Sequence, residues 1–274
     1  MAIWFRANKL AVNISKTKYI IFRMKGKKID DDLPPVLYNG NEQNVPNDDT
    51  LITPLERYFD QHPSKDGRAY KLLGLYLDEH LSFNFHTDFL AGKLTKSLYC
   101  IKQAKHIIPL QGMRALYFAL VHSHLTYCSS IMSLLSAKNI NKIKKIQKKA
   151  LRIMDNCAYN AHTNPILIKH QILPYNLLIK QAQLNFMHSI FHNYAPASFN
   201  NVWQTNAERN PNLNLRNAND YYVQQPRTET FKKSTLYNLP TVWNELSPFI
   251  KLQPNKITFK WALKAHLIAE LEPE

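Results

Sequence analysis

The chain has 274 residues, of which 45% are hydrophobic, enough to bury one large core or two modest ones. It has no apolar run long enough to cross a membrane, and the charges near its start interrupt any secretory signal, so we expect an intracellular protein of the nucleus or cytoplasm. The chain has only 6 glycines, which argues against a glycine-rich nucleotide-binding fold. Its three cysteines are widely spaced, which argues against a disulfide framework and a zinc knuckle.

The net charge of +15 is concentrated in one part of the chain. Residues 89–154 contain twelve lysines or arginines and no aspartate or glutamate, which leaves 23 of the 35 basic residues to balance 20 acidic residues elsewhere. A field of a single sign attracts polyanions, and nucleic acid is the commonest of them. We therefore favour nucleic-acid binding over a basic surface that only aids solubility.

The first 80 residues predict a small β region. Two runs of β-prone residues, 19–22 and 70–77, are separated by a turn-rich connection that contains Pro34-Pro35 and Asn39-Gly40. After Asp78 the spacing of apolar residues changes from two to nearly four, which indicates helices. The expected fold class is therefore α+β but predominantly α-helical.

Residues 81–157 predict three consecutive amphipathic helices that pack as a small bundle. The first is stopped by Pro109, the second runs from about Gln111 to Tyr127, and the third from about Asn139 to Met154. The third helix has an apolar seam formed by Ile140, Ile143, Ile146, Ala150 and Met154. Residues 158–274 predict a helical C-terminal region, with helices around 177–193 and 259–271 and an asparagine-rich loop over 200–219.

The other faces of the third predicted helix are the strongest candidate site for nucleic acid. Their basic residues are Lys142, Lys144, Lys145, Lys148, Lys149 and Arg152. Cations spaced i, i+3 and i+4 give a stripe of phosphate contacts without reading the bases. The alternative is a solvated lysine-rich face, but exposed helices usually mix charge signs to gain i,i+4 pairs, and this helix has no glutamate.

Short motifs follow one another in a fixed order along residues 3–265. The early ones are Trp4-Phe5, Asn8-Lys9-Leu10, Asn13, Ser15-Lys16-Thr17-Lys18 and Phe22, then Tyr70-Lys71-Leu72-Leu73-Gly74-Leu75 with Asp78, Leu81, Phe83 and His86. The later ones are Leu116-Tyr117, Ser123-His124-Leu125, Tyr127, Ile146-Gln147-Lys148-Lys149-Ala150-Leu151-Arg152-Ile153, His162-Thr163 with Pro165, Arg227, Phe231-Lys232-Lys233-Ser234, Trp243-Asn244 with Leu246, Phe259 and Leu263. Their order and spacing resemble the part of non-LTR (LINE-type, jockey-like) retrotransposon reverse transcriptases that follows the polymerase palm.

The resemblance implies a division into three parts. Residues 1–80 would be a remnant of the palm edge, 81–157 the thumb, and 158–274 the C-terminal region. Lys16 would be an accessory lysine near the leaving pyrophosphate in an intact parent enzyme. Leu73 and Gly74 would form the primer grip, where a glycine lets the backbone approach the primer strand; an ordinary strand with a bulge is the alternative.

The resemblance also implies what this sequence does not contain. In the family, aspartates of the palm hold two Mg²⁺ ions, and they precede the Asn-Lys-Leu segment. We therefore expect a truncated RNA-directed DNA polymerase that binds RNA or an RNA–DNA template–primer, is inactive alone, and holds no cofactor, since Mg²⁺ belongs to the intact parent. The alternatives are a host-retained or decayed relic acting as a basic RNA- or protein-interaction module, and a fragment never made alone.

Two acidic clusters and a histidine pair are poor candidates for metal sites. Asp48-Asp49 imitates a catalytic pair but follows the Ser-Lys-Thr-Lys segment, and Asp30-Asp31-Asp32 lies beside two prolines in what we interpret as a solvated turn. His188 and His192 are spaced i,i+4 but have no third ligand nearby. We predict no metal site. Trp203, Trp243, Trp261 and the 14 tyrosines could stack on bases, but a core role suits most of them better.

Overall fold

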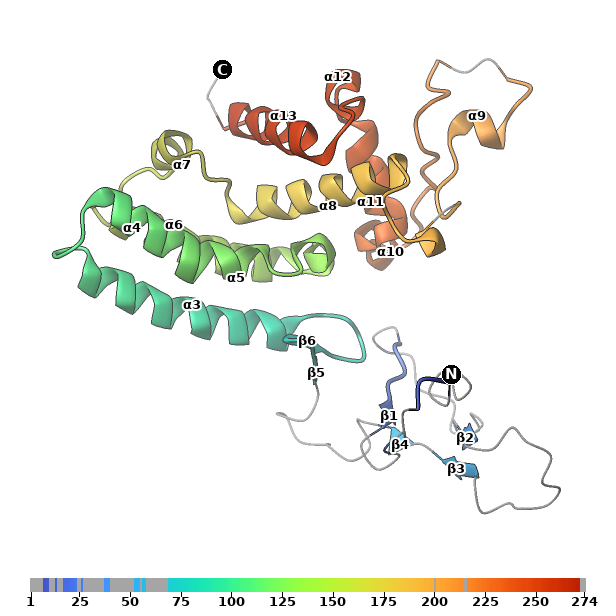
Figure 1. Cartoon of the computed structure of the whole chain (residues 1–274), viewed down its shortest axis with the longest axis horizontal. Coiled ribbons are helices and arrows are strands. Elements are labelled where there is room, and N and C mark those ends of the chain that lie inside the picture. The colour runs from blue at the N-terminus through green and yellow to red at the C-terminus, as the bar shows by residue number, and fades with distance from the viewer. Residues whose placement is uncertain are drawn as a thin grey trace. The chain divides into compact units, whose positions relative to one another are not determined.

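The computed structural model of the chain describes residues 7–9, 13, 17–23, 26, 37–39, 52–54, 56–57, 69–199, 201–213 and 216–271 (Figure 1). The chain divides into two compact units, Met1–His86 and Thr87–Glu274. The described residues are mostly helical with a few short strands, which confirms the expected predominantly α-helical class. Among these residues, none of the helices combines the length and the apolar character that a membrane crossing needs.

The described part of the first unit contains three pairs of short strands. β1 (Lys18–Tyr19) pairs in parallel with β4 (Glu56–Arg57), β2 (Leu37–Asn39) pairs antiparallel with β3 (Ile52–Pro54), and β5 (Tyr70–Leu72) pairs antiparallel with β6 (Leu75–Leu77). The apolar run 70–77 is therefore a hairpin and not a single strand with a bulge.

The β5–β6 hairpin closes through a two-residue turn. Leu72 pairs with Leu75, so Leu73 and Gly74 alone form the turn, with φ angles of 47° and 91°. Two consecutive positive φ angles fit the right-handed twist of the flanking strands. Glycine adopts this conformation freely, whereas the Leu73 Cβ makes it costly.

A buried carboxylate organises the chain between β6 and the first long helix. Asp78 Oδ1 accepts hydrogen bonds from the backbone N–H groups of His80 and Ser82, at 3.0 and 3.1 Å. Asp78 Oδ2 accepts from Phe83 N at 2.9 Å and from Ser82 Oγ at 3.0 Å. Four hydrogen bonds compensate the burial of this group and hold a turn in which Leu81 and Phe83 have positive φ angles.

The helical elements follow in sequence order along the rest of the chain. They are α3 (Asn84–Ala104), α4 (Leu110–Tyr117), the π-helical η4 (Phe118–His122), α5 (Ser123–Thr126), the 3₁₀ helix η5 (Ser129–Leu134), α6 (Ala137–Met154), α7 (Asn164–His170), α8 (Tyr175–Phe191), the 3₁₀ helix η6 (Ala197–Phe199), α9 (Asn206–Arg209), α10 (Glu229–Lys233), α11 (Thr235–Asn244), α12 (Pro248–Lys251) and α13 (Lys256–Ala269).

Helix α8 is the centre of the second unit. It packs against η5, α5 and α6 on the N-terminal side of the sequence and against α11 and α13 on the C-terminal side. Figure 1 shows α8 between α5 and α13. Its apolar stripe includes Leu178, Leu184 and Met187, all of them buried. The segments 87–157 and 158–274 therefore share one core around α8.

The second predicted helix contains a π-helical segment. Its buried residues are Met113, Tyr117, Val121 and Leu125, each four positions after the last. One α-helical turn takes 3.6 residues, so four residues make more than one full turn. Side chains spaced strictly four apart would therefore shift gradually around the helix and away from the core. The wider turn of η4 offsets this drift and keeps all four side chains directed at the core.

The asparagine-rich segment 200–219 is not a loop throughout, because it contains α9. Thr205 and Glu208 form a capping box at its start, in which each side chain accepts from the backbone N–H of the other residue. Asn244 of α11 fixes the end of the segment: its Oδ1 accepts from Tyr221 N at 3.0 Å and its Nδ2 donates to Tyr221 O at 2.8 Å.

Candidate nucleic-acid interface

Helix α6 carries the candidate site. Ser136 caps its start, where Ser136 Oγ accepts a hydrogen bond from Asn139 N at 3.3 Å. The side chains that face the core are Asn139, Ile143, Gln147, Ala150, Leu151 and Met154. The predicted seam was therefore wrong at two positions, since Ile140 and Ile146 are only half-buried while Asn139 and Gln147 lie in the core. Gln147 can take a core position because Tyr117 Oη, Leu173 O and Tyr175 N supply partners for its side-chain amide.

The six predicted contact residues form two rows along α6. Lys142, Lys145 and Lys149 are exposed and point to solvent. Lys144, Lys148 and Arg152 are half-buried and follow one another at intervals of four, along the edge of the helix. We call these six side chains the α6 basic surface. Lys138 also lies on the exposed row, four residues before Lys142, and its spacing would have identified it from the sequence.

One lysine of the α6 basic surface is paired with an acid. Lys142 Nζ lies 2.6 Å from Asp88 Oδ1 of α3, a residue just before the acid-free stretch. Both side chains are well exposed, so this ion pair contributes little to stability but partly neutralises Lys142. The other five cations of the surface form no ion pair with any residue that the structure describes.

The half-buried row borders a cleft of 310 Å³. Lys148 and Arg152 form one wall, and the segment Asn160–Asn164, which contains the His162-Thr163 motif, forms the other. Arg152 Nε donates a hydrogen bond to Ala161 O at 2.8 Å, so this arginine also holds the segment against α6. The cleft therefore brings a motif of the family resemblance next to two predicted phosphate contacts.

A buried acidic group marks the C-terminal end of the α6 basic surface. Asp155 Oδ1 accepts hydrogen bonds from Lys169 Nζ at 2.8 Å and from His170 Nε2 at 2.7 Å. Burial raises the pKa of Asp155, but these hydrogen bonds outweigh burial and hold its pKa below the ordinary value of 3.8. Asp155 is therefore ionised at neutral pH and neutralises Lys169.

The predicted primer grip lies at the tip of the β5–β6 hairpin. Leu73 is 85% exposed, and Gly74 follows it in the turn. Lys16, Asp30-Asp31-Asp32 and Asp48-Asp49 lie outside the described residues. Leu73 and Gly74 belong to the first unit, and the α6 basic surface belongs to the second.

The histidine pair does not belong to a cluster of metal ligands in the described ranges, and two of the tryptophans differ in burial. The rings of His188 and His192 lie 4.3 Å apart, and within the described ranges no group of three or more His, Cys, Asp or Glu side chains is arranged to hold a metal ion. Trp243 is buried in the core, as expected. Trp261, in contrast, is 76% exposed on α13, so it is not one of the tryptophans with a core role.

Comparison with known proteins adds no assignment: no protein-family model, no curated protein and no solved structure matches the chain. The resemblance to retrotransposon reverse transcriptases therefore rests on the sequence motifs alone.

Proposed function

We propose that the chain binds RNA or an RNA–DNA template–primer through the α6 basic surface, as the thumb and C-terminal part of a non-LTR retrotransposon reverse transcriptase. The observation that carries the proposal is the arrangement of charge on α6. One helix presents six cations in two adjacent rows, and only Lys142 among them has an acidic partner in the described structure. Such a surface is costly to keep in a folded protein unless an anion faces it.

The dimensions of the surface suit a nucleic-acid backbone. Lys142 and Arg152 are ten residues apart, which corresponds to about 15 Å along the helix axis. A duplex strand carries a phosphate about every 3.4 Å along its axis, so the surface spans roughly four phosphates. Lysine and arginine side chains in this arrangement contact phosphates without distinguishing bases, as a thumb that tracks a moving duplex requires.

The cleft beside α6 supports the same proposal. Arg152 uses Nε to hold Ala161, which leaves its terminal nitrogens as donors at the cleft edge, next to Lys148. A guanidinium fixed in this way loses little conformational freedom when it binds a phosphate oxygen. The His162-Thr163 segment is held in place by the same hydrogen bond, so the motif and the cations form one surface.

The test is binding of the full chain to a fluorescent RNA–DNA hybrid, followed by anisotropy across a salt series. We expect sub-micromolar binding with a logarithmic salt slope of about −3.6, the value for roughly four neutralised phosphates. Replacing Lys145 and Lys149 by glutamate should weaken binding at least about tenfold and reduce the slope by about 2.

A matched control variant distinguishes the effect of the α6 basic surface on binding from the effect of net charge. Arg216 and Arg227 are exposed and lie outside α6, so Arg216→Glu with Arg227→Glu changes the net charge equally. We expect this control to retain most of the affinity. Equal loss in both double variants, or no loss in the α6 variant, would reject the proposal.

A further inference from the structure

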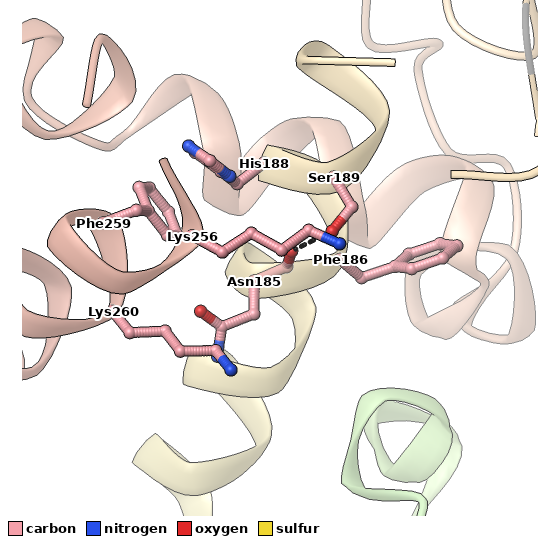
Figure 2. A pocket seen from close by; sticks show the side chains of 7 residues that line it. All are labelled: Asn185, Phe186, His188, Ser189, Lys256, Phe259 and Lys260. Carbon is pink, nitrogen blue, oxygen red and sulfur yellow. Dashed lines mark hydrogen bonds between the residues drawn. The ribbon is translucent and has the colours of Figure 1, made fainter. Parts of the chain in front are cut away.

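Helix α13 is apolar on two sides. On the side that packs against α8, Phe259, Leu263 and Leu267 are buried. Figure 2 shows Phe259 beside His188 of α8, and the two rings stack with their centroids 4.1 Å apart. A surface helix normally presents polar side chains opposite its buried stripe, whereas a helix that is apolar all round is usually covered on every side. The outer side of α13 therefore needs an explanation.

The outer side of α13 carries a row of four exposed apolar residues. Ile257, Trp261, Ala265 and Ala269 follow one another at intervals of four, which places them on one side of the helix. All four are exposed, and Trp261 exposes 76% of its surface. We call this row the α13 apolar ridge. Its first two side chains are large and its last two are small.

The exposed apolar area at this end of the chain approaches what a dimer needs. Helix α12, which contacts α13, adds the exposed side chains of Phe249 and Leu252. Taking 150–250 Å² for a whole aromatic side chain, the four large residues leave roughly 500 Å² exposed, near the upper end for the largest patch of a monomer. A stable interface of standard size buries about 800 Å² on each partner. The four residues supply more than half of that area.

The lysines of α13 do not accompany the α13 apolar ridge. Figure 2 shows the Lys256 side chain extending towards Ser189 and the Lys260 side chain extending towards Asn185, and both of these residues belong to α8. A surface that stacks nucleic-acid bases combines its aromatic rings with cations that follow the backbone. Trp261 lies on the side of the helix away from these two cations, so the ridge fits an apolar protein surface better than an RNA strand.

The order of side chains along the ridge makes it complementary to itself. Two copies of α13 that pack antiparallel about a two-fold axis at the level of Leu263 bring Trp261 of each copy to Ala265 of the other. The same axis directs Ile257 towards Ala269 of the other copy. Each large side chain thus meets a small one, and the same surface serves both partners, as a two-fold interface requires.

We propose that the chain forms a two-fold dimer through the α13 apolar ridge, with Trp261 of each copy packed against Ala265 of the other. The exposed residues of α12 extend the contact. The dimer does not depend on RNA or on the α6 basic surface, so it goes beyond the function proposed above.

The first experiment measures the mass of the nuclease-treated full chain by sedimentation over a range of micromolar concentrations. High salt suppresses association through residual RNA. We expect a dimer that dissociates on dilution. Trp261→Ala should raise its dissociation constant at least about thirtyfold, because a buried aromatic residue at the centre of an interface dominates binding. The matched control is Tyr159→Ala, which removes an aromatic side chain that is 78% exposed and lies outside α13, and it should leave the dissociation constant unchanged.

The second experiment tests the pairing of Trp261 with Ala265. Ala265→Trp places two tryptophans against each other, and we expect it to prevent the dimer. Trp261→Ala combined with Ala265→Trp exchanges the large and the small residue, so it should restore the dimer that each single variant loses. Both positions are exposed in the monomer, and circular dichroism should show unchanged helix content in all three variants.

Three outcomes would overturn the dimer. They are a chain that stays monomeric at every concentration, a dimer that persists in Trp261→Ala, and a dimer strengthened by Ala265→Trp, which a non-specific apolar contact would give. A monomer whose RNA affinity falls in Trp261→Ala would assign the ridge to base stacking and overturn the dimer as well. None of these results changes the effect expected of Lys145→Glu with Lys149→Glu on RNA binding, so the two proposals fail separately.

Discussion

Gln147 Nε2 donates a hydrogen bond to Tyr117 Oη at 3.1 Å, in the core between α6 and α4. The same nitrogen donates to Leu173 O at 2.9 Å, and Gln147 Oε1 accepts from Tyr175 N at 2.8 Å. One buried amide thus connects α6 to α4 and to the start of α8. These three hydrogen bonds fix the rotation of α6 about its axis, and this rotation determines which lysines reach solvent.

Replacing Gln147 by leucine should destabilise the fold. The variant leaves a buried carbonyl, a backbone N–H and the Tyr117 hydroxyl without this partner, and we expect a loss of about 2–4 kcal/mol in the free energy of unfolding. Tyr117→Phe removes only one of the hydrogen bonds and should cost about 1 kcal/mol. Equilibrium denaturation in urea measures both. A Gln147→Leu variant as stable as the parent would show that the amide does not fix α6.

Tyr175 should make stability depend on alkaline pH. Burial raises its pKa to about 12 from the ordinary value of 10.0, so the folded state keeps a proton that the unfolded state loses. The contribution is fully present below pH 10 and is lost as the pH rises towards 12. At pH 11 the loss is about 1.4 kcal/mol from this residue. Urea titrations from pH 9 to pH 11 should show a shallower decline in Tyr175→Phe, and equal declines would contradict the assignment.

Asp88→Asn should strengthen nucleic-acid binding. The change releases Lys142 from its ion pair, so one more cation becomes available to a phosphate. We expect a gain of several-fold in affinity at low salt and a salt slope steeper by up to 1. Stability should change by less than about 1 kcal/mol because the pair is exposed. In a Lys142→Gln background the gain should vanish, and a gain that persists there would place its origin elsewhere.

The variant Leu73→Asn distinguishes a role of Leu73 in the hairpin turn from a role in contacting the primer. Asparagine adopts positive φ angles more readily than leucine, so the β5–β6 hairpin should be retained or stabilised by up to about 1 kcal/mol. Slower hydrogen exchange at Leu75 N–H would report this. If Leu73 contacts the primer, affinity for an RNA–DNA hybrid should nevertheless fall. Unchanged binding by a well-folded variant would leave Leu73 and Gly74 as a turn only.

The long helices were predictable because each buries a periodic stripe. α6 and α8 lie within a few residues of the ranges expected from the sequence, and α3 ends before Pro109 as expected. The short elements η5, α7, α10 and α12 bury too few side chains to produce a readable period. α9 is an exception, since the spacing of Thr205 and Glu208 is a capping-box signal that the asparagine-rich composition obscured.

The candidate site was predictable in its residues but not in its environment. The charge of Lys145 and Lys149 and their exposure follow from helical spacing alone. The pairing of Lys142 with Asp88 and the contact of Arg152 with Ala161 are tertiary, and no local pattern encodes them. The position of Gln147 in the core was missed for the same reason, since its burial depends on partners from α4 and α8.

The packing of η5, α6, α11 and α13 around α8 has a consequence for the order in which the chain folds. Until α8 has left the ribosome, Ile143 and Leu151 of α6 have no complete apolar surface to pack against, although the lysines of that helix are already charged. The nascent polypeptide would then expose both the cations and the apolar face of α6.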